Sequence, residues 1–286
     1  MKGHNISVIS DEFGTLDFER VAKYLHEVNL RYVELRFVWI KNVGYFDDMD
    51  IQEVKEILKE NELKVSCISS GLLKTKWWGT NDSPRLMGDG TWIKDEQIKL
   101  AKNCIKIASE LDCDYIRAFG FRKSDDPSED VWNTWINAVN SISEMANQKG
   151  KMVVIENEHG CIISDLNSIF NGFKRIRAKN CKLLLDPGNL FAAGDILTKE
   201  IMEKLANITG YIHVKDARHK ENGKGREWTL IGEGEVGWKE ITRYFVRKIP
   251  RLFWSVETHF GDKHSKWNHT VKNIENLDTL LSTNLE

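Results

Sequence analysis

The chain has 286 residues, of which 41% are hydrophobic and 29% charged, and only 4 are prolines. This composition excludes a disordered or collagen-like protein and indicates a compact chain rich in regular elements. The 41 Lys and Arg residues nearly balance the 43 Asp and Glu residues, so no overall basic field attracts a phosphate backbone. We therefore expect no nucleic-acid partner.

Short runs of β-branched or apolar residues recur along the chain and predict eight strands, at 6–10, 32–36, 64–68, 115–119, 152–156, 182–186, 211–215 and 253–257. Segments with a helical period lie between most of them, at 18–28, 51–61, 96–111 and 131–150. The first helix carries an apolar stripe at i, i+3, i+4 and i+7, formed by Phe18, Val21, Ala22, Leu25 and Val28.

Alternating strands and helices predict right-handed parallel βα units, and eight such units close into a barrel. We therefore predict an α/β fold, a single (β/α)₈ TIM barrel that spans 1–286 as one domain. An open, doubly wound sheet is the alternative. No early strand is followed by the GxGxxG turn that a dinucleotide site needs, which argues against that alternative.

Two connections are longer than a minimal barrel requires. One spans 74–95 and carries Trp77, Trp78 and Trp92, and the other spans 220–238 and carries five glycines. Both follow the C-terminal end of a strand, which is the face where barrel active sites lie. We predict that they form a lid or wall over a substrate, with Trp77 as a candidate for stacking on an apolar face of that substrate. A plain surface insertion is the alternative for each.

The cysteines and the N-terminus bear on cellular location. Polar and acidic residues interrupt 1–13, where a secretory signal needs an apolar stretch, and no window approaches the ~20 apolar residues of a membrane span. The five cysteines form no CxxC pair or Cys/His cluster of the kind that builds structural zinc sites. We expect a cytoplasmic protein with reduced, mostly buried thiols and no membrane partner.

The last four predicted strands end in residues that can bind a metal, namely Glu156, Asp186, His213 and Glu257. Three carboxylates at one mouth of a barrel repel one another strongly unless a divalent cation neutralises them. Three oxygens and one imidazole suit Mn²⁺, Co²⁺ or Mg²⁺ and are compatible with Zn²⁺. Each acid alone could instead cap the helix that follows its strand. Four such residues in succession favour a metal site.

The segments VVIENE, LLLDPGN, YIHVKD and SVETH resemble the metal-binding strand ends of the xylose-isomerase-like TIM-barrel superfamily of sugar isomerases and epimerases. ISDEFGTLDFERVAKYLHEVNLRYVELR, VSCISSGL and LIGEGEVGWKEI resemble other parts of that fold, so the resemblance covers essentially the whole chain. It implies that Glu156, Asp186, His213 and Glu257 are metal ligands and that Glu156 and Glu257 also form the catalytic acid/base pair.

The activity implied by the resemblance is metal-dependent isomerisation or epimerisation of a sugar or keto-polyol through a cis-enediolate. The epimerase branch usually has His three residues after the Asp ligand, whereas this chain has Asn189. Relatives in the superfamily leave two other reactions open. One is a lyase reaction of the inosose dehydratase type. The other is an endonuclease IV-like phosphodiesterase, which requires further histidines at the early strand ends, where this chain has none.

Other polar residues near the strand ends are candidates for binding a sugar or polyol substrate. Arg36 and Arg117 could reach the cavity or be held in ion pairs with Glu34 or Glu158, and His159 and His259 could orient the ligand carboxylates. A noncatalytic carbohydrate-binding barrel would leave the acid cluster without a purpose, and homo-oligomerisation stays open. The predicted substrate-binding set is Arg36, Trp77, Glu158, Asn189, Lys215, Arg218 and His259.

Overall fold

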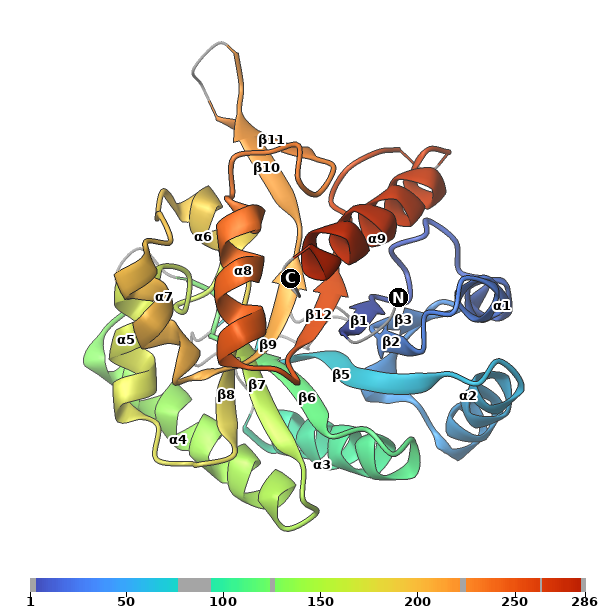
Figure 1. Cartoon of the computed structure of the whole chain (residues 1–286). Coiled ribbons are helices and arrows are strands. Elements are labelled where there is room, and N and C mark those ends of the chain that lie inside the picture. The colour runs from blue at the N-terminus through green and yellow to red at the C-terminus, as the bar shows by residue number, and fades with distance from the viewer. Residues whose placement is uncertain (1–3, 77–93, 124–126, 222–224, 263, 284–286) are drawn as a thin grey trace.

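The computed structural model describes residues 4–76, 94–123, 127–221, 225–262 and 264–283. Eight parallel strands form the central sheet, in the order β1-β12-β9-β8-β7-β6-β5-β2 (Figure 1). Their bounds are β1 Asn5–Val8, β2 Tyr32–Leu35, β5 Lys64–Leu72, β6 Tyr115–Phe119, β7 Met152–Glu156, β8 Cys181–Leu185, β9 Thr209–Val214 and β12 Phe253–Val256.

The two outer strands of this order, β1 and β2, meet where the residues just after β1 reach β2. Ile9 forms a parallel bridge with Glu34, and the amide of Ser10 donates a hydrogen bond to the carbonyl of Glu34 at 2.8 Å. The sheet is therefore a nearly closed barrel. The predicted TIM-barrel fold is confirmed, and the open doubly wound sheet is excluded.

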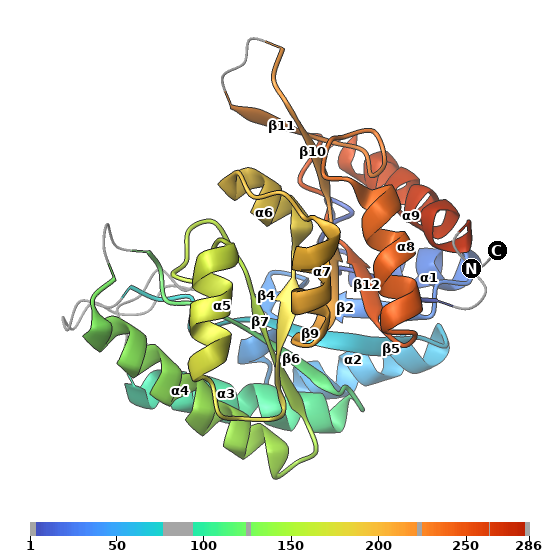
Figure 2. The same ribbon diagram turned by 60° about the vertical axis from the view of Figure 1, so that its left-hand side comes forward.

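Helices surround the barrel on its outer side (Figures 1 and 2). Helix α1 shows why they form: Asp17 caps its first turn, and the apolar stripe predicted from the sequence is buried at Phe18, Val21, Ala22 and Leu25. The helices are α1 Phe18–Glu27, α2 Asp48–Glu60, α3 Lys94–Glu110, α4 Glu129–Asn147, α5 Leu166–Arg175, α6 Pro187–Ala193, α7 Lys199–Ala206, α8 Trp238–Lys248 and α9 Lys266–Ser282, with a 3₁₀ turn at Val43–Tyr45.

The long connection after β9 contains an antiparallel hairpin of β10, Asp216–His219, and β11, Arg226–Thr229. It projects away from the barrel in both views (Figures 1 and 2). Asp216 anchors its base by accepting hydrogen bonds from the amides of Gly232, Gly234 and Val236. A Cβ on Gly234 would lie 2.2 Å from Oδ1 of Asp216, so this position requires glycine.

A shorter hairpin, β3 Phe37–Val38 and β4 Lys41–Asn42, follows β2. The other long connection, after β5, lies almost entirely outside the described residues, and so does Trp77.

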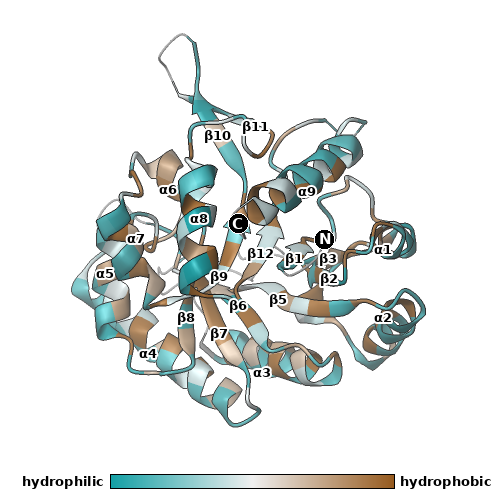
Figure 3. Ribbon diagram, viewed as in Figure 1, coloured by the Kyte–Doolittle hydropathy of each residue, from teal (hydrophilic) through white to brown (hydrophobic). Residues whose placement is uncertain are grey.

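Apolar side chains pack between the barrel and its helices. Figure 3 shows hydrophobic residues (brown) alternating with hydrophilic ones (teal) along the helices. A second, small apolar layer inside the barrel consists of Cys67, Val154, Leu184 and Tyr211. All five cysteines are buried and unpaired. Within the described ranges, no helix has the length and apolar character needed to cross a membrane.

Candidate metal centre

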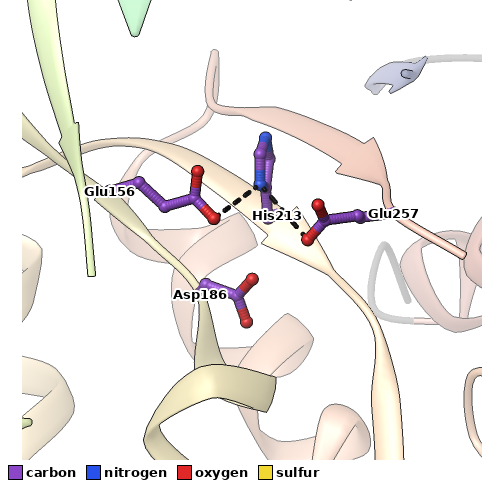
Figure 4. A group of neighbouring side chains, drawn as sticks. All are labelled: Glu156, Asp186, His213 and Glu257. Atoms are coloured by element: carbon purple, nitrogen blue, oxygen red, sulfur yellow. Dashed lines mark ion pairs between the residues drawn. The ribbon is translucent and has the colours of Figure 1, made fainter. Parts of the chain in front are cut away.

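The barrel brings the four predicted metal ligands to one mouth. Glu156 ends β7, His213 lies near the end of β9, and Asp186 and Glu257 directly follow β8 and β12. One ligand atom from each residue lies within 4.8 Å of the other three, and all four side chains are buried (Figure 4). This cluster could hold a metal ion.

The two ring nitrogens of His213 face different surroundings. Nε2 lies 2.9 Å from Oε1 of Glu34, within hydrogen-bonding distance. Nδ1 lies 3.4 Å from Oε1 of Glu156 and 3.8 Å from Oε2 of Glu257, which are ion-pair contacts and not well-formed hydrogen bonds (Figure 4). The ring nitrogen that faces the cluster is therefore Nδ1. Burial lowers the pKa of His213, but the nearby carboxylates of Glu34 and Glu156 outweigh burial and raise this pKa to about 10.

Glu156 is held by an arginine from the neighbouring strand β6. Nη1 of Arg117 lies 3.0 Å from Oε2 of Glu156, and both side chains are almost fully buried. Arg117 also donates to the carbonyl of Ser69 at 3.1 Å, which fixes its guanidinium. Burial raises the pKa of Glu156, but the charges of His213 and Arg117 lower it below its usual value. Glu156 is thus an ionised carboxylate at neutral pH.

The two carboxylate oxygens of Asp186 have different roles: one caps a helix and the other faces the cluster. Its Oδ1 caps helix α6 by accepting from the amide of Asn189 at 2.8 Å, so the capping role considered from the sequence is real. Its Oδ2 lies 2.8 Å from Nζ of Lys215. Burial raises the pKa of Asp186 despite this ammonium group. Gly188 leaves room for Lys215, because a Cβ there would lie 2.7 Å from its Cγ.

Glu257 is contacted by nitrogen atoms of several neighbouring side chains. Nζ of Lys215 lies 2.7 Å from its Oε2, Nη1 of Arg36 lies 3.0 Å from its Oε1, and Nε2 of His259 lies 3.3 Å from its Oε2. Burial raises the pKa of this carboxyl, but Lys215 and His259 lower it well below its usual value. Glu257 is therefore also ionised at neutral pH.

Arg36, expected from the sequence to bind substrate, is instead engaged by three carboxylates. It forms a bidentate pair with Asp11, with both N–O distances at 2.9 Å, and it also contacts Glu12 and Glu257. Arg36 lines the cavity, but its donors are directed at these acids. Its placement is that of a residue that holds Glu257.

A cavity of about 480 Å³ opens above the cluster and contains Glu156, Lys215 and Glu257 in its wall. Trp228 on β11 forms part of the same wall and stacks on His259, with ring centroids 5.1 Å apart. A larger hollow of about 1020 Å³ lies between α4 and α5, but none of the four ligands lines it. The smaller cavity is the candidate substrate site.

Four other residues of the predicted substrate-binding set line this cavity: Glu158, Asn189, Lys215 and His259. Arg218 is not brought to it, because its side chain is 52% exposed on β10 and pairs with Glu227. The connection at 220–238 contributes to the cavity wall through Trp228.

Sequence reasoning did not identify two wall residues, Trp228 and Asp11, as site candidates. Trp228 lies within the long glycine-containing connection, so an aromatic residue in an insertion at the catalytic face was the available signal. Asp11 follows the first strand, where a polar residue at a strand end was the signal.

Comparisons with known proteins agree with this architecture. Over 127 residues the chain is 25% identical to inosose dehydratase of Geobacillus thermodenitrificans, and this match spans 40% of the chain and 42% of that relative's length. The structure of the probable 3-DHS dehydratase AsbF from Bacillus anthracis superposes with a TM-score of 0.73 at 19% identity, covering 96% of this chain and 98% of that one.

D-psicose 3-epimerase from Clostridium cellulolyticum H10, solved with D-tagatose, superposes with a TM-score of 0.69 at 13% identity, covering 99% of both chains. At these identities the structural matches show the fold alone. The family model of the xylose isomerase-like TIM barrel matches residues 22–277. The chain belongs to the xylose isomerase-like TIM barrel family.

Proposed function

We propose that the protein is a metal-dependent isomerase or epimerase that moves a proton next to the carbonyl of a sugar or keto-polyol. One observation carries this proposal: two ionised glutamates, Glu156 and Glu257, stand with Asp186 and His213 in one buried cluster at the wall of a cavity. Such a cluster combines a cation site with groups that can accept and return a proton.

The charges around the cluster fit a divalent cation. Arg117 and Lys215 bring two positive charges to the buried acids, while Arg36 is shared with Asp11 and Glu12, and Lys266 pairs with Glu12 at 3.0 Å. A bound cation would require His213 to be neutral at Nδ1, and two negative charges would then remain uncompensated among the four carboxylates Glu34, Glu156, Asp186 and Glu257. A 2+ ion supplies that difference, and oxygen and imidazole ligands suit Mn²⁺, Co²⁺, Mg²⁺ or Zn²⁺.

The proton chemistry would be carried out by the glutamates. A bound divalent cation would polarise the substrate carbonyl and lower the pKa of the adjacent C–H. One of Glu156 and Glu257 would accept that proton while the C–H electron pair shifts toward the carbonyl. The other would return a proton to the enolised substrate, on the opposite face in an epimerase or on the neighbouring carbon in an isomerase.

Residues around the glutamates would keep them in place and hold the substrate. Arg117 on β6 and Arg36 just after β2 fix the two carboxylates. We assign substrate hydroxyl contacts to Glu158, Asn189, Lys215 and His259, which line the cavity. Trp228 would offer its ring to the apolar face of a sugar.

A dehydratase is the second candidate, and Lys215 favours it. Its ammonium group lies 2.7 Å from Glu257, so an acid and a base stand side by side. After Glu257 or Glu156 removes the proton next to the carbonyl, Lys215 could protonate the β-hydroxyl, which would leave as water while a C=C bond forms. The partial sequence match to an inosose dehydratase supports this alternative.

Proton NMR in D₂O would test the proposal. Purified protein with Mn²⁺, later removed by chelation to sharpen the spectra, would be incubated with a panel of ketoses and keto-polyols. We expect exchange of the hydrogen next to a carbonyl, with an epimer or isomer as product. Growth of ultraviolet absorbance from a conjugated enone, with one water lost, would instead establish the dehydratase. No deuterium uptake with any substrate in the panel would contradict both.

A further inference from the structure

Glu34 is a fully buried carboxylate that has no part in the proton chemistry proposed above. It lies on β2, and its side chain is 0% exposed. In the sheet order, β1 and β12 separate β2 from β9 once the barrel closes. Glu34 therefore reaches His213 across the barrel interior and not along neighbouring strands.

The contact between these two residues has a defined direction. Oε1 of Glu34 lies 2.9 Å and Oε2 lies 3.2 Å from Nε2 of His213. The same carboxylate accepts hydrogen bonds from the hydroxyls of Tyr211, at 2.9 Å, and Ser69. Three donors from two strands, β9 and β5, thus fix Glu34, and it can only accept from the Nε2 side of the imidazole.

This arrangement limits what His213 can do on its other side. An imidazole binds a cation through the lone pair of a ring nitrogen that carries no proton. With Nε2 donating to Glu34, the lone pair belongs to Nδ1, and Nδ1 is the nitrogen that faces Glu156 and Glu257. The His213 ring stands between Glu34 and the cluster, so Glu34 is not itself placed as a ligand.

We propose that Glu34 is a positioning residue for the metal centre: it holds the proton of His213 on Nε2 and directs the Nδ1 lone pair at the cation. A carboxylate behind a ligating imidazole also makes that imidazole more basic, and loss of such a partner typically weakens metal affinity about 10- to 100-fold. This inference rests on the metal binding in the proposed function and adds a residue to it.

The first test measures metal affinity and needs no substrate. Protein stripped by chelation would be titrated with Mn²⁺ in a calorimeter, for the wild type, Glu34→Gln and Glu110→Gln. Glu110 is the control because the same substitution there affects a half-exposed carboxylate that pairs with Lys55 and not with His213 or its partners. We expect Glu34→Gln to weaken binding about 10- to 100-fold and Glu110→Gln to leave the affinity close to that of the wild type.

The second test reads the tautomer directly in the wild type, so it does not depend on the folding of a variant. Nitrogen-15 NMR of the imidazoles in protein loaded with Zn²⁺ should show His213 protonated at Nε2 and metal-bound at Nδ1. A proton on Nδ1, or an unchanged dissociation constant in folded Glu34→Gln, would overturn the inference while leaving the proposed function intact. A wild type that takes up no divalent ion would overturn both.

Discussion

The two halves of the barrel contribute different parts of the site. Strands β7, β8, β9 and β12 supply the four candidate ligands, and strands β1, β2 and β6 supply the groups that hold three of them. Arg117 holds Glu156, Glu34 holds His213, and Arg36, itself fixed by Asp11, holds Glu257. Asp186 is the exception, because its partner Lys215 comes from the ligand half. The candidate metal centre is thus built across the barrel and not from one side of it.

Removing the metal should have the largest effect, because the four ligands on β7, β8, β9 and β12 would then have no cation to bind. We expect chelation to reduce activity to background and Mn²⁺ to restore it. A cation at 100 times its Kd stabilises the folded state by about 2.7 kcal/mol, so the melting temperature should rise on adding Mn²⁺. Calorimetric melts with and without the ion measure this. Equal melting temperatures together with full activity in chelator would contradict a metal centre.

Breaking the buried pair between β6 and β7 should cost stability even without metal. Arg117→Met removes the hydrogen-bonded cationic partner of Glu156, and breaking a buried ion pair by removing one partner costs about 3–5 kcal/mol. Denaturant unfolding of chelated protein measures this loss. Lys55→Met is the control, because it breaks the Lys55–Glu110 pair, in which both side chains are about half exposed, and we expect little change there. If the two variants unfold at the same denaturant concentration, Arg117 does not support Glu156 energetically.

Glu257→Gln separates proton transfer from metal binding. The amide keeps the size of the side chain and one oxygen, so Glu156, Asp186 and His213 should still hold the cation while proton transfer fails. We expect kcat to fall ~10²-fold or more, which is about 2.7 kcal/mol of transition-state stabilisation. Asp186→Asn should instead weaken Mn²⁺ affinity, with activity partly restored by excess ion. Full rescue of Glu257→Gln by excess metal would leave Glu257 as a ligand only.

The smallest effect is expected where the β10–β11 hairpin lines the cavity. Trp228→Ala removes a ring that faces the cavity, and aromatic stacking contacts contribute about 0.5–1.5 kcal/mol, or roughly 2- to 10-fold in KM. Steady-state kinetics should show the change mainly in KM, since the groups that move protons are untouched. Glu227→Gln on the same strand is the control, because Glu227 pairs with the exposed Arg218. Equal KM values for the two variants would remove Trp228 from the substrate site.

The sequence was sufficient to predict the barrel and the residues of the ligand half. Each ligand follows an apolar run, and strand alternation and parallel order place such residues at one mouth. The residues on β1, β2 and β6 that hold the ligand side chains could not be predicted with the same certainty. Whether Arg36 binds substrate or Glu257 depends on distances across the barrel, and Arg36 and Glu257 are 221 positions apart in the chain.

The conformation of the insertion after β9 could not be predicted from the sequence either. Its length and glycines indicated an elaborated connection at the catalytic face, but not a hairpin. The register in which Ala217 opposes Trp228 is fixed by β10–β11 pairing and by the amides that Asp216 accepts. These contacts turn Trp228 to the cavity and leave Arg218 exposed.

Anomalous diffraction from a crystal soaked in Mn²⁺ would test the central claim most directly. The account predicts one strong peak per chain, with oxygens of Glu156, Asp186 and Glu257 and Nδ1 of His213 as its protein ligands. An absent peak at saturating Mn²⁺, or a peak bound by other residues and by none of these four, would contradict it.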